Sequence, residues 1–254
     1  MALPEEAIPL DEAALLIAAG ADPDLDVSAQ LARLDELASQ QLGVADTEQV
    51  CHLVFKTLGL RGDTQTYDDP RNSYLHQVLD RQLGIPISLS VLLMEIGRRC
   101  GVPLEGVGMP GHFLVRDPGR PDLLIDAFSG GRRLDPAECA RLIHAVTGEA
   151  IELRGDMLAT VGSRAILARM LANLDHSFRR RRDRNGVRWV TSLRAAIPGL
   201  SMADRMALAD GLAGLGSYEE AAAHLEEMAR AHGTSPEDAH TLLTRARELL
   251  APFN

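Results

Sequence analysis

Residues 84–103 of the chain, GIPISLSVLLMEIGRRCGVP, decide its fold. Pro86 suits the first turn of a helix, where its missing N–H leaves no hydrogen bond unmade. Apolar side chains then occur on every side of the predicted helix over residues 87–100, and Gly101 and Pro103 end it. A helix that is apolar all round is typical of the centre of a domain. We therefore expect the fold to be built around this helix.

Two short β-type segments follow the central helix. HFLVR (112–116) and LLIDAF (123–128) are joined by the turn-rich DPGRPD, which predicts an antiparallel hairpin. His112 and Asp126 then lie opposite or nearly opposite each other, where facing Cβ atoms are about 5 Å apart. A carboxylate at that distance can hold an imidazole in one tautomer. A register slip of one residue would separate the two side chains across the sheet.

Helical spacing of apolar residues predicts helices over residues 11–20, 26–42 and 46–60. The segment YDDPRNSYLHQVLDRQLG (67–84) opens on a turn, after which Asn72 or Ser73 is expected to cap a helix that runs to Leu83.

A helix over residues 135–147 follows the hairpin, with Asp135 as its cap, and from residue 156 we expect helix alone. Within that tail, GLAGLGSYEEAAAHLEEMARAH (211–232) looks like one tetratricopeptide helix pair.

Ser88 falls in the first turn of the central helix, where free N–H groups and the helix dipole stabilise an anion. With His112 as base and Asp126 as the group that orients it, Ser88 completes the order of an acyl-transfer site. A hydroxyl there needs a well-placed base in each turnover, whereas a thiol would be a standing thiolate. The alternative is structural: Ser88 caps the helix and His112 bonds a backbone carbonyl. Ser90 is expected to be structural.

Other candidate sites are weaker. Cys100 would offer a thiol to His112 and Asp126, but it lies at the helix C-terminus, where the dipole raises a thiol pKa. The basic run Arg179–Arg184 is expected to close a helix, with a docking surface for an acidic partner as the alternative. No histidine or cysteine cluster has metal-ligand spacing, so we expect no metal and no cofactor.

Composition excludes several classes of function. A net charge of −10 is unsuited to nucleic acid or an anionic membrane surface. Three cysteines without metal spacing fit a reducing compartment. The acidic N-terminal segment is unlike a secretory signal, and no apolar run approaches membrane-spanning length. We expect a cytoplasmic protein that binds neither nucleic acid nor membrane.

Taken together, DPRNS (69–73), GIPISL (84–89) and PGHFLVR (110–116) resemble the bacterial branch of the transglutaminase-like superfamily that ends in tetratricopeptide-type helices, the Sir-B-one-type family. A related domain occurs in a eukaryotic F-box protein. The resemblance is strong over residues 50–145 and looser in the tail. It implies a papain-like core in which a helix cysteine, a strand histidine and a next-strand aspartate form the site. By position, the cysteine place falls at or beside Ser88, the histidine at His112 and the aspartate at Asp126. The branch resembles this chain in lacking the cysteine.

The sequence and the resemblance together predict an α+β papain-like core, in which a central buried helix lies against a small antiparallel sheet, followed by an all-helical tail. We expect a helical lead-in over residues 1–60, the core over 61–155 and the tail over 156–254. Two functions remain open. One is a protein- or peptide-binding module that uses the cleft and the tail and has little or no acyl-transfer activity. The other is a serine-type amidase, peptidase or acyltransferase that uses Ser88, His112 and Asp126.

Overall fold

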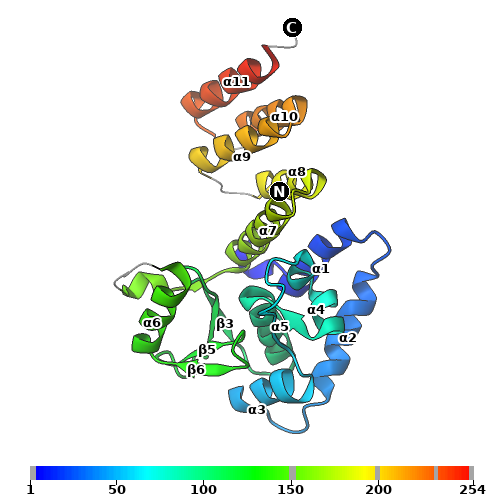
Figure 1. Ribbon diagram of the computed structural model, residues 1–254, viewed down its shortest axis with the longest axis vertical. Helices are drawn as coiled ribbons and strands as arrows, with labels where there is room; N and C mark the ends of the chain where they lie inside the picture. The colour runs from blue at the N-terminus through cyan, green and yellow to red at the C-terminus, as the bar shows by residue number, and fades with distance from the viewer. Residues whose placement is uncertain (1–3, 149–152, 198–200, 232–233, 252–254) are drawn as a thin grey trace. The chain divides into compact units, whose positions relative to one another are not determined.

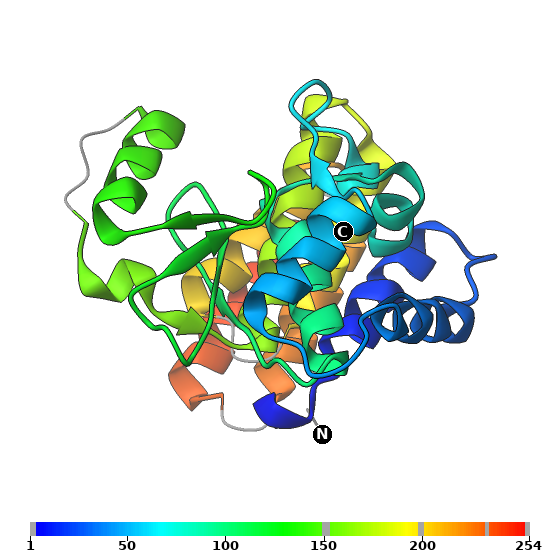
Figure 2. The same cartoon turned by 90° about the horizontal axis from the view of Figure 1, so that it is seen from below.

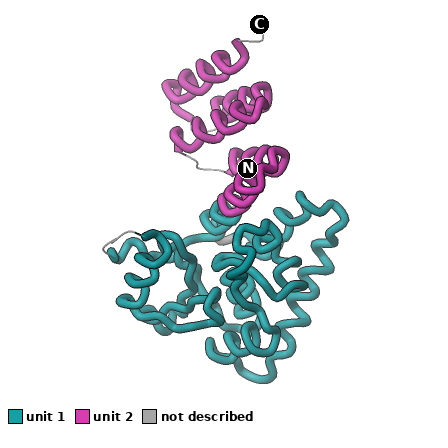
Figure 3. The backbone as a smooth tube through the Cα atoms, in the orientation of Figure 1, with its two compact units in different colours: residues 1, 3–170 teal, residues 2, 171–254 magenta. Residues whose placement is uncertain are grey.

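A computed structural model of the protein describes residues 4–148, 153–197, 201–231 and 234–251. The chain forms two compact units, of which the first ends at Met170 and the second begins at Leu171 (Figure 3). The sequence boundaries at residues 60 and 155 do not coincide with this division. The expected lead-in packs into the core of the first unit, and the first unit continues into the helix Ser163–Arg180.

The first unit is an α+β fold (Figure 1). Its helices are α1 (Leu10–Ala21), α2 (Val27–Ser39), α3 (Thr47–His52, continued as a π-helical turn to Thr57), α4 (Leu75–Arg81), α5 (Pro86–Arg99), α6 (Pro136–Thr147) and the first part of α7 (Ser163–Arg180). Its strands are β1 (Arg61–Gly62), β2 (Leu83–Gly84), β3 (Glu105–Val107), β4 (Leu114–Arg116), β5 (Leu124–Asp126), β6 (Arg132–Leu134) and β7 (Thr160–Val161).

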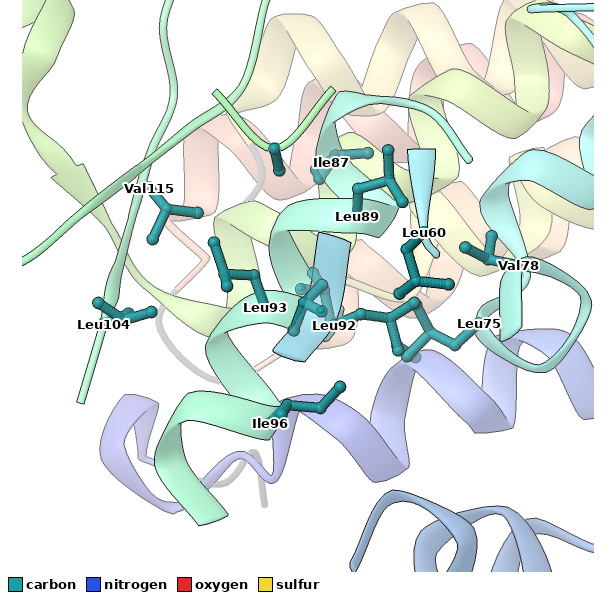
Figure 4. Packing of buried hydrophobic residues seen from close by; sticks show 14 of the residues in the cluster. Leu60, Leu75, Val78, Ile87, Leu89, Leu92, Leu93, Ile96, Leu104 and Val115 are labelled. Carbon is teal, nitrogen blue, oxygen red and sulfur yellow. The ribbon is translucent and has the colours of Figure 1, made fainter. Parts of the chain in front are cut away.

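Helix α5 is the buried centre of this unit, as the sequence predicts. Its side chains Ile87, Leu89, Leu92, Leu93 and Ile96 are at most 1% exposed. Figure 4 shows them among apolar side chains from the neighbouring elements. Burial of each such side chain stabilises the fold by about 1.5–3 kcal/mol. α5 lies between the sheet and the group α1, α2 and α4 (Figure 2).

The main sheet has five strands in the order β6-β5-β4-β3-β7, and each neighbouring pair is antiparallel. β4 pairs with β5 through Val115–Ile125 and Arg116–Leu124, so the predicted hairpin is confirmed. The expectation of helix alone after residue 156 is wrong at β7, which pairs with β3. A two-residue strand is too short to produce an alternating pattern in the sequence.

The two faces of the sheet pack against different helices because successive side chains alternate across a strand. Val115 and Ile125 belong to the cluster around α5. Leu114 and Leu124 belong instead to a second cluster that includes Ile143 of α6. α5 and α6 therefore cover opposite faces of the sheet.

The segment before α4 differs from the sequence expectation. The prediction that Asn72 or Ser73 caps a helix that runs to Leu83 is wrong: α4 begins at Leu75, has Tyr74 at its N-cap and ends at Arg81. Asp69 caps the 3-10 turn Pro70–Ser73 that precedes α4, and its carboxylate accepts a hydrogen bond from the Arg71 N–H. Asn72 and Ser73 lie inside that turn and are buried. Pro70 takes the first position of the turn, where its fixed φ is accommodated.

The second unit is helical in its described residues. After the end of α7 it contains α8 (Arg184–Ala195), α9 (Met202–Gly214), α10 (Tyr218–Arg230) and α11 (Pro236–Leu250). α9 and α10 are joined at Gly216, whose φ of +82° favours glycine, and both contribute to one apolar cluster. The predicted helix pair is thus present, and its tetratricopeptide nature stays a prediction.

Candidate functional site

His112 ends a tight turn that begins at Met109. The His112 N–H donates to the Met109 carbonyl oxygen at 3.2 Å, with Pro110 and Gly111 between them. Gly111 has a φ of +70°, as the third position of a type II turn requires. A Cβ atom at Gly111 would lie 2.8 Å from Val146 of α6. The PG pair is therefore demanded both by the turn and by the close approach of α6.

The Asp126 carboxylate is the hydrogen-bond acceptor of the site. Its Oδ1 lies 2.8 Å from Nε2 of His112 and also accepts from the Phe128 N–H at 3.0 Å. Its Oδ2 accepts from the Ser129 hydroxyl at 2.6 Å. Burial raises the pKa of Asp126, but the hydrogen bonds with His112 and Ser129 outweigh it and leave the pKa below its usual value. Asp126 is therefore ionised at neutral pH.

The predicted pairing of His112 with Asp126 is confirmed in space. An ionised carboxylate can only accept, so Nε2 of His112 carries a proton, and in the neutral imidazole Nδ1 then presents a lone pair. Within the described residues Nδ1 has no hydrogen-bond partner, and this atom is exposed to solvent rather than buried. The imidazole is thus held in one tautomer and keeps one ring nitrogen accessible.

Two aromatic rings extend from His112 toward solvent. The Phe128 ring centroid lies 6.2 Å from that of His112, in an edge-to-face arrangement. Tyr67 contacts Phe128 in the same way at 5.9 Å and is 44% exposed. Val146, which lies against the Gly111 turn, is 48% exposed. Exposed apolar side chains therefore border the turn that carries His112.

Ser88 is placed differently. Its side chain is fully buried, and its hydroxyl donates to the Asn72 carbonyl oxygen at 2.6 Å. The hydroxyl oxygen of Ser88 also accepts a hydrogen bond from the Ile85 N–H at 3.1 Å. The bond with the Ile85 N–H is that of a third helix residue to the N-cap backbone, and the bond with Asn72 ties α5 to the preceding turn. No hydrogen bond in the described part of the chain joins Ser88 to His112.

The structure joins His112 and Asp126 by a hydrogen bond. Within the described residues Ser88 forms hydrogen bonds with Asn72 and Ile85 and none with His112 or Asp126.

A buried polar network beneath Ser88 was missed from the sequence. The Asp63 carboxylate accepts from the Thr66 hydroxyl, from the Thr66 N–H and from the Asn72 amide. The Asn72 amide oxygen accepts from Arg81 at 2.9 Å. Burial raises the pKa of Asp63, but these hydrogen bonds outweigh it and lower the pKa to about 2. The DPRNS block is thus a structural support for the start of α5.

None of the three cysteines provides an activated thiol. Cys100 lies 3.7 Å from the Ala38 carbonyl oxygen, and burial raises its pKa. Burial also raises the pKa of Cys51 and of Cys139 to about 11. The Cys100–His112–Asp126 alternative is therefore unsupported by the contacts of Cys100.

Arg169 of α7 was also missed. Its guanidinium donates to the carbonyl oxygens of Met109 at 3.0 Å and His112 at 2.7 Å, and it lies 5.5 Å from the Phe113 ring centroid. Arg169 thus binds both ends of the turn that positions His112. Its distance along the chain leaves no local signal in the sequence.

No group of three His, Cys, Asp or Glu side chains among the described residues is arranged to hold a metal ion. No helix within them is long and apolar enough to cross a membrane.

Comparison with known proteins agrees with the fold. A model of the family described as "Transglutaminase-like superfamily" matches residues 23–172. A UPF0162 protein of Xylella fastidiosa (strain Temecula1) is 42% identical over 195 residues, which are 71% of this chain and 68% of that protein. A UPF0162 protein of Pseudomonas aeruginosa is 35% identical over 180 residues, with 68% and 66% covered.

F-box only protein 21 of Mus musculus is 35% identical over 148 residues, which are 55% of this chain and 22% of that protein. No solved structure matches this chain. The family match covers more than half of the 254 residues and contains α5, the hairpin, His112 and Asp126. The chain therefore belongs to the transglutaminase-like superfamily.

Proposed function

We propose that this protein is a transglutaminase-like protein that binds a protein or peptide near His112 and has little or no acyl-transfer activity. The observation that carries the proposal is the position of the Ser88 hydroxyl, which is fully buried and donates to the Asn72 carbonyl oxygen at 2.6 Å. Acyl transfer needs a nucleophile within hydrogen-bond reach of its base. Ser88 makes no such bond with His112 in the described residues.

The surroundings of His112 support binding. Nδ1 of His112 can accept a hydrogen bond from a backbone N–H, while Asp126 holds the imidazole in place. Tyr67 and Phe128 provide aromatic area beside it, and Tyr67 is 44% exposed. Aromatic side chains of this kind contribute strongly to protein interfaces.

The helical tail would add binding surface. One cavity of about 340 Å³ is lined by Arg188 and residues 216–220. A second, of about 260 Å³, is lined by side chains of α8, α9 and α10 that include Arg205 and His224. Hollows between helices are common sites for peptide side chains. No observation favours the serine-type enzyme over the binding module.

Two measurements test the proposal. The first treats wild type and Ser88→Ala with a fluorophosphonate probe; we expect no labelling of Ser88. The second selects a random peptide library on wild type and measures the affinity of the selected peptides. Truncation of a residue at the centre of an interface costs about 2 kcal/mol or more. We expect His112→Ala to weaken binding at least tenfold, and Arg141→Gln, an exposed change on α6, to leave it unchanged. Labelling of Ser88, or peptides indifferent to His112→Ala, would contradict the proposal.

A further inference from the structure

Arg169 carries a positive charge next to His112 that no acidic side chain of the described residues neutralises through an ion pair. Its guanidinium contacts two carbonyl oxygens and the Phe113 ring, and within the described ranges it forms no ion pair. Two other sequestered arginines of the first unit are paired: Arg81 contacts Asp63, and Arg99 contacts Asp11, Asp35 and Glu95. Arg116, like Arg169, binds a main-chain carbonyl, that of Leu158, and forms no ion pair in the described residues. A partly buried charge is costly unless it is paired, so an unneutralised guanidinium favours the arrival of an anion.

The guanidinium retains donors for a ligand. Arginine has five N–H donors, and the two carbonyl bonds of Arg169 use only two of its nitrogens, Nη1 and Nη2. The Nε atom has no hydrogen-bond partner in the described structure and is exposed to solvent rather than buried. Burial lowers the pKa of Arg169. Tyr67 and Phe128 reach the same turn through the ring contacts of Tyr67 with Phe128 and of Phe128 with His112.

The chemistry of these neighbours defines the ligand. A guanidinium binds a carboxylate through parallel N–H bonds, and aromatic rings accept an apolar or aromatic side chain. We propose that Arg169 forms a carboxylate-binding subsite beside His112, which takes an acidic group of a bound peptide, with Tyr67 and Phe128 against the adjoining side chain. This inference rests on the proposed function and specifies its ligand. The carboxylate can be the C-terminus of the peptide or an acidic side chain.

Three fixed probes separate these sources: N-acetyl-Ala-Phe as the free acid, the same dipeptide as its C-terminal amide, and N-acetyl-Glu-Phe amide. Each is titrated into the full chain, and NMR follows the Arg169 Nε–H and the His112 ring. We expect the free acid, the Glu peptide or both to bind at least tenfold more tightly than the Ala-Phe amide. The stronger of the two acids identifies the source of the carboxylate.

Variants then assign the preference to Arg169. Arg169→Gln should reduce the acid-to-amide ratio to less than twofold, whereas Arg141→Gln on α6 should leave it unchanged. Arg169→Lys keeps the charge but loses the forked donor geometry, so it should retain part of the preference. Arg169→Gln also removes two hydrogen bonds from the His112 turn, so the variant could lose binding for a structural reason. Binding to the wild type is therefore also measured at two salt concentrations, which tests the charge contribution without a substitution. Higher salt should weaken the acids and leave the amide unaffected.

Equal binding of acids and amide by wild type, or a ratio unchanged in Arg169→Gln, would overturn the subsite. The absence of any binding by the three dipeptides would overturn it as well. None of these results bears on the library peptides and their dependence on His112, which test the proposed function separately.

Discussion

The hydroxyl oxygen of Ser88 lies 2.6 Å from the carbonyl oxygen of Asn72, and this hydrogen bond joins the first turn of α5 to the turn Pro70–Ser73. The donor is on the central helix and the acceptor is a main-chain atom of the polar network around Asp63. A serine at the start of a helix is thus committed to holding two segments together.

Loss of this bond should reduce stability measurably. Ser88→Ala leaves the buried Asn72 carbonyl without its donor, and we expect a loss of about 1–3 kcal/mol. Ser90 offers a matched control on the same helix, because its hydroxyl is equally buried but has no hydrogen-bond partner within the described residues. Ser90→Ala should therefore change stability by no more than about 0.5 kcal/mol. Hydrogen exchange of the α5 amides measures both. Equal effects would show that the Asn72 bond contributes nothing.

The Asp63 network should make stability depend on pH in the acid range. The folded-state pKa of Asp63 is about 2, below its ordinary value of 3.8, so the ionised form stabilises the fold. That contribution, about 2 kcal/mol, is complete above pH 5 and is lost as the pH falls toward 2. Asp63→Asn should remove this part of the slope in urea titrations between pH 2 and 5. Asp24→Asn, at an exposed position, should leave the slope unchanged.

The His112 tautomer can be observed directly. With Asp126 ionised, ¹⁵N NMR of neutral His112 should show a proton on Nε2 and none on Nδ1. Asp126→Ala should abolish this preference, because the acceptor for Nε2–H is gone. Ser129→Ala removes one partner of the carboxylate but keeps the His112 bond, so the tautomer should persist. A proton on Nδ1 in wild type would contradict the assignment.

Gly111 should tolerate a side chain less well than Gly101, which also has a positive φ. Gly101 has a φ of +76° with open space around its Cβ position, so Gly101→Ala should cost about 1 kcal/mol. Gly111→Ala adds a contact of 2.8 Å with Val146, and we expect about 2–4 kcal/mol. Thermal unfolding of the two variants compares them. The prediction fails if both lose the same stability.

The cysteines should react slowly in the folded protein. With a pKa of about 11, Cys51 and Cys139 are almost entirely protonated at pH 7.5, and the thiolate fraction of each is about one part in three thousand. Iodoacetamide should modify all three cysteines much more slowly before urea is added than after, as followed by mass spectrometry of the three peptides. A cysteine that reacts natively as fast as a small-molecule thiol would reveal an activated nucleophile.

Local pattern was enough to predict the central helix, the hairpin and the pairing of His112 with Asp126. Each of these follows from residues close in sequence: the Pro86 start, the all-round apolar run and the two strand segments around DPGRPD. The hairpin register itself comes from side chains that alternate between two clusters.

The remaining features depend on contacts that no local pattern encodes. The partner of Ser88 is the main-chain carbonyl of Asn72, an atom that every residue possesses. Arg169 reaches the His112 turn from a helix that follows the whole sheet, and its sequence neighbours are ordinary helix residues. The side-chain identity of Ser88 alone could not distinguish a cap from a nucleophile, since both functions favour a hydroxyl at that position.

The two-residue strand β7 has a consequence for the solubility of the first unit. Thr160 and Val161 pair with Val107 and Gly106, so they occupy the main-chain groups on the outer side of β3. A chain cut after Gly155 would keep the sheet but leave β3 as its open edge. Open edges recruit strands from other molecules, and such a fragment should self-associate where the longer chain does not. By covering the edge of β3, the short segment ahead of α7 should reduce aggregation. It belongs to the sheet although it lies next to the tail in sequence.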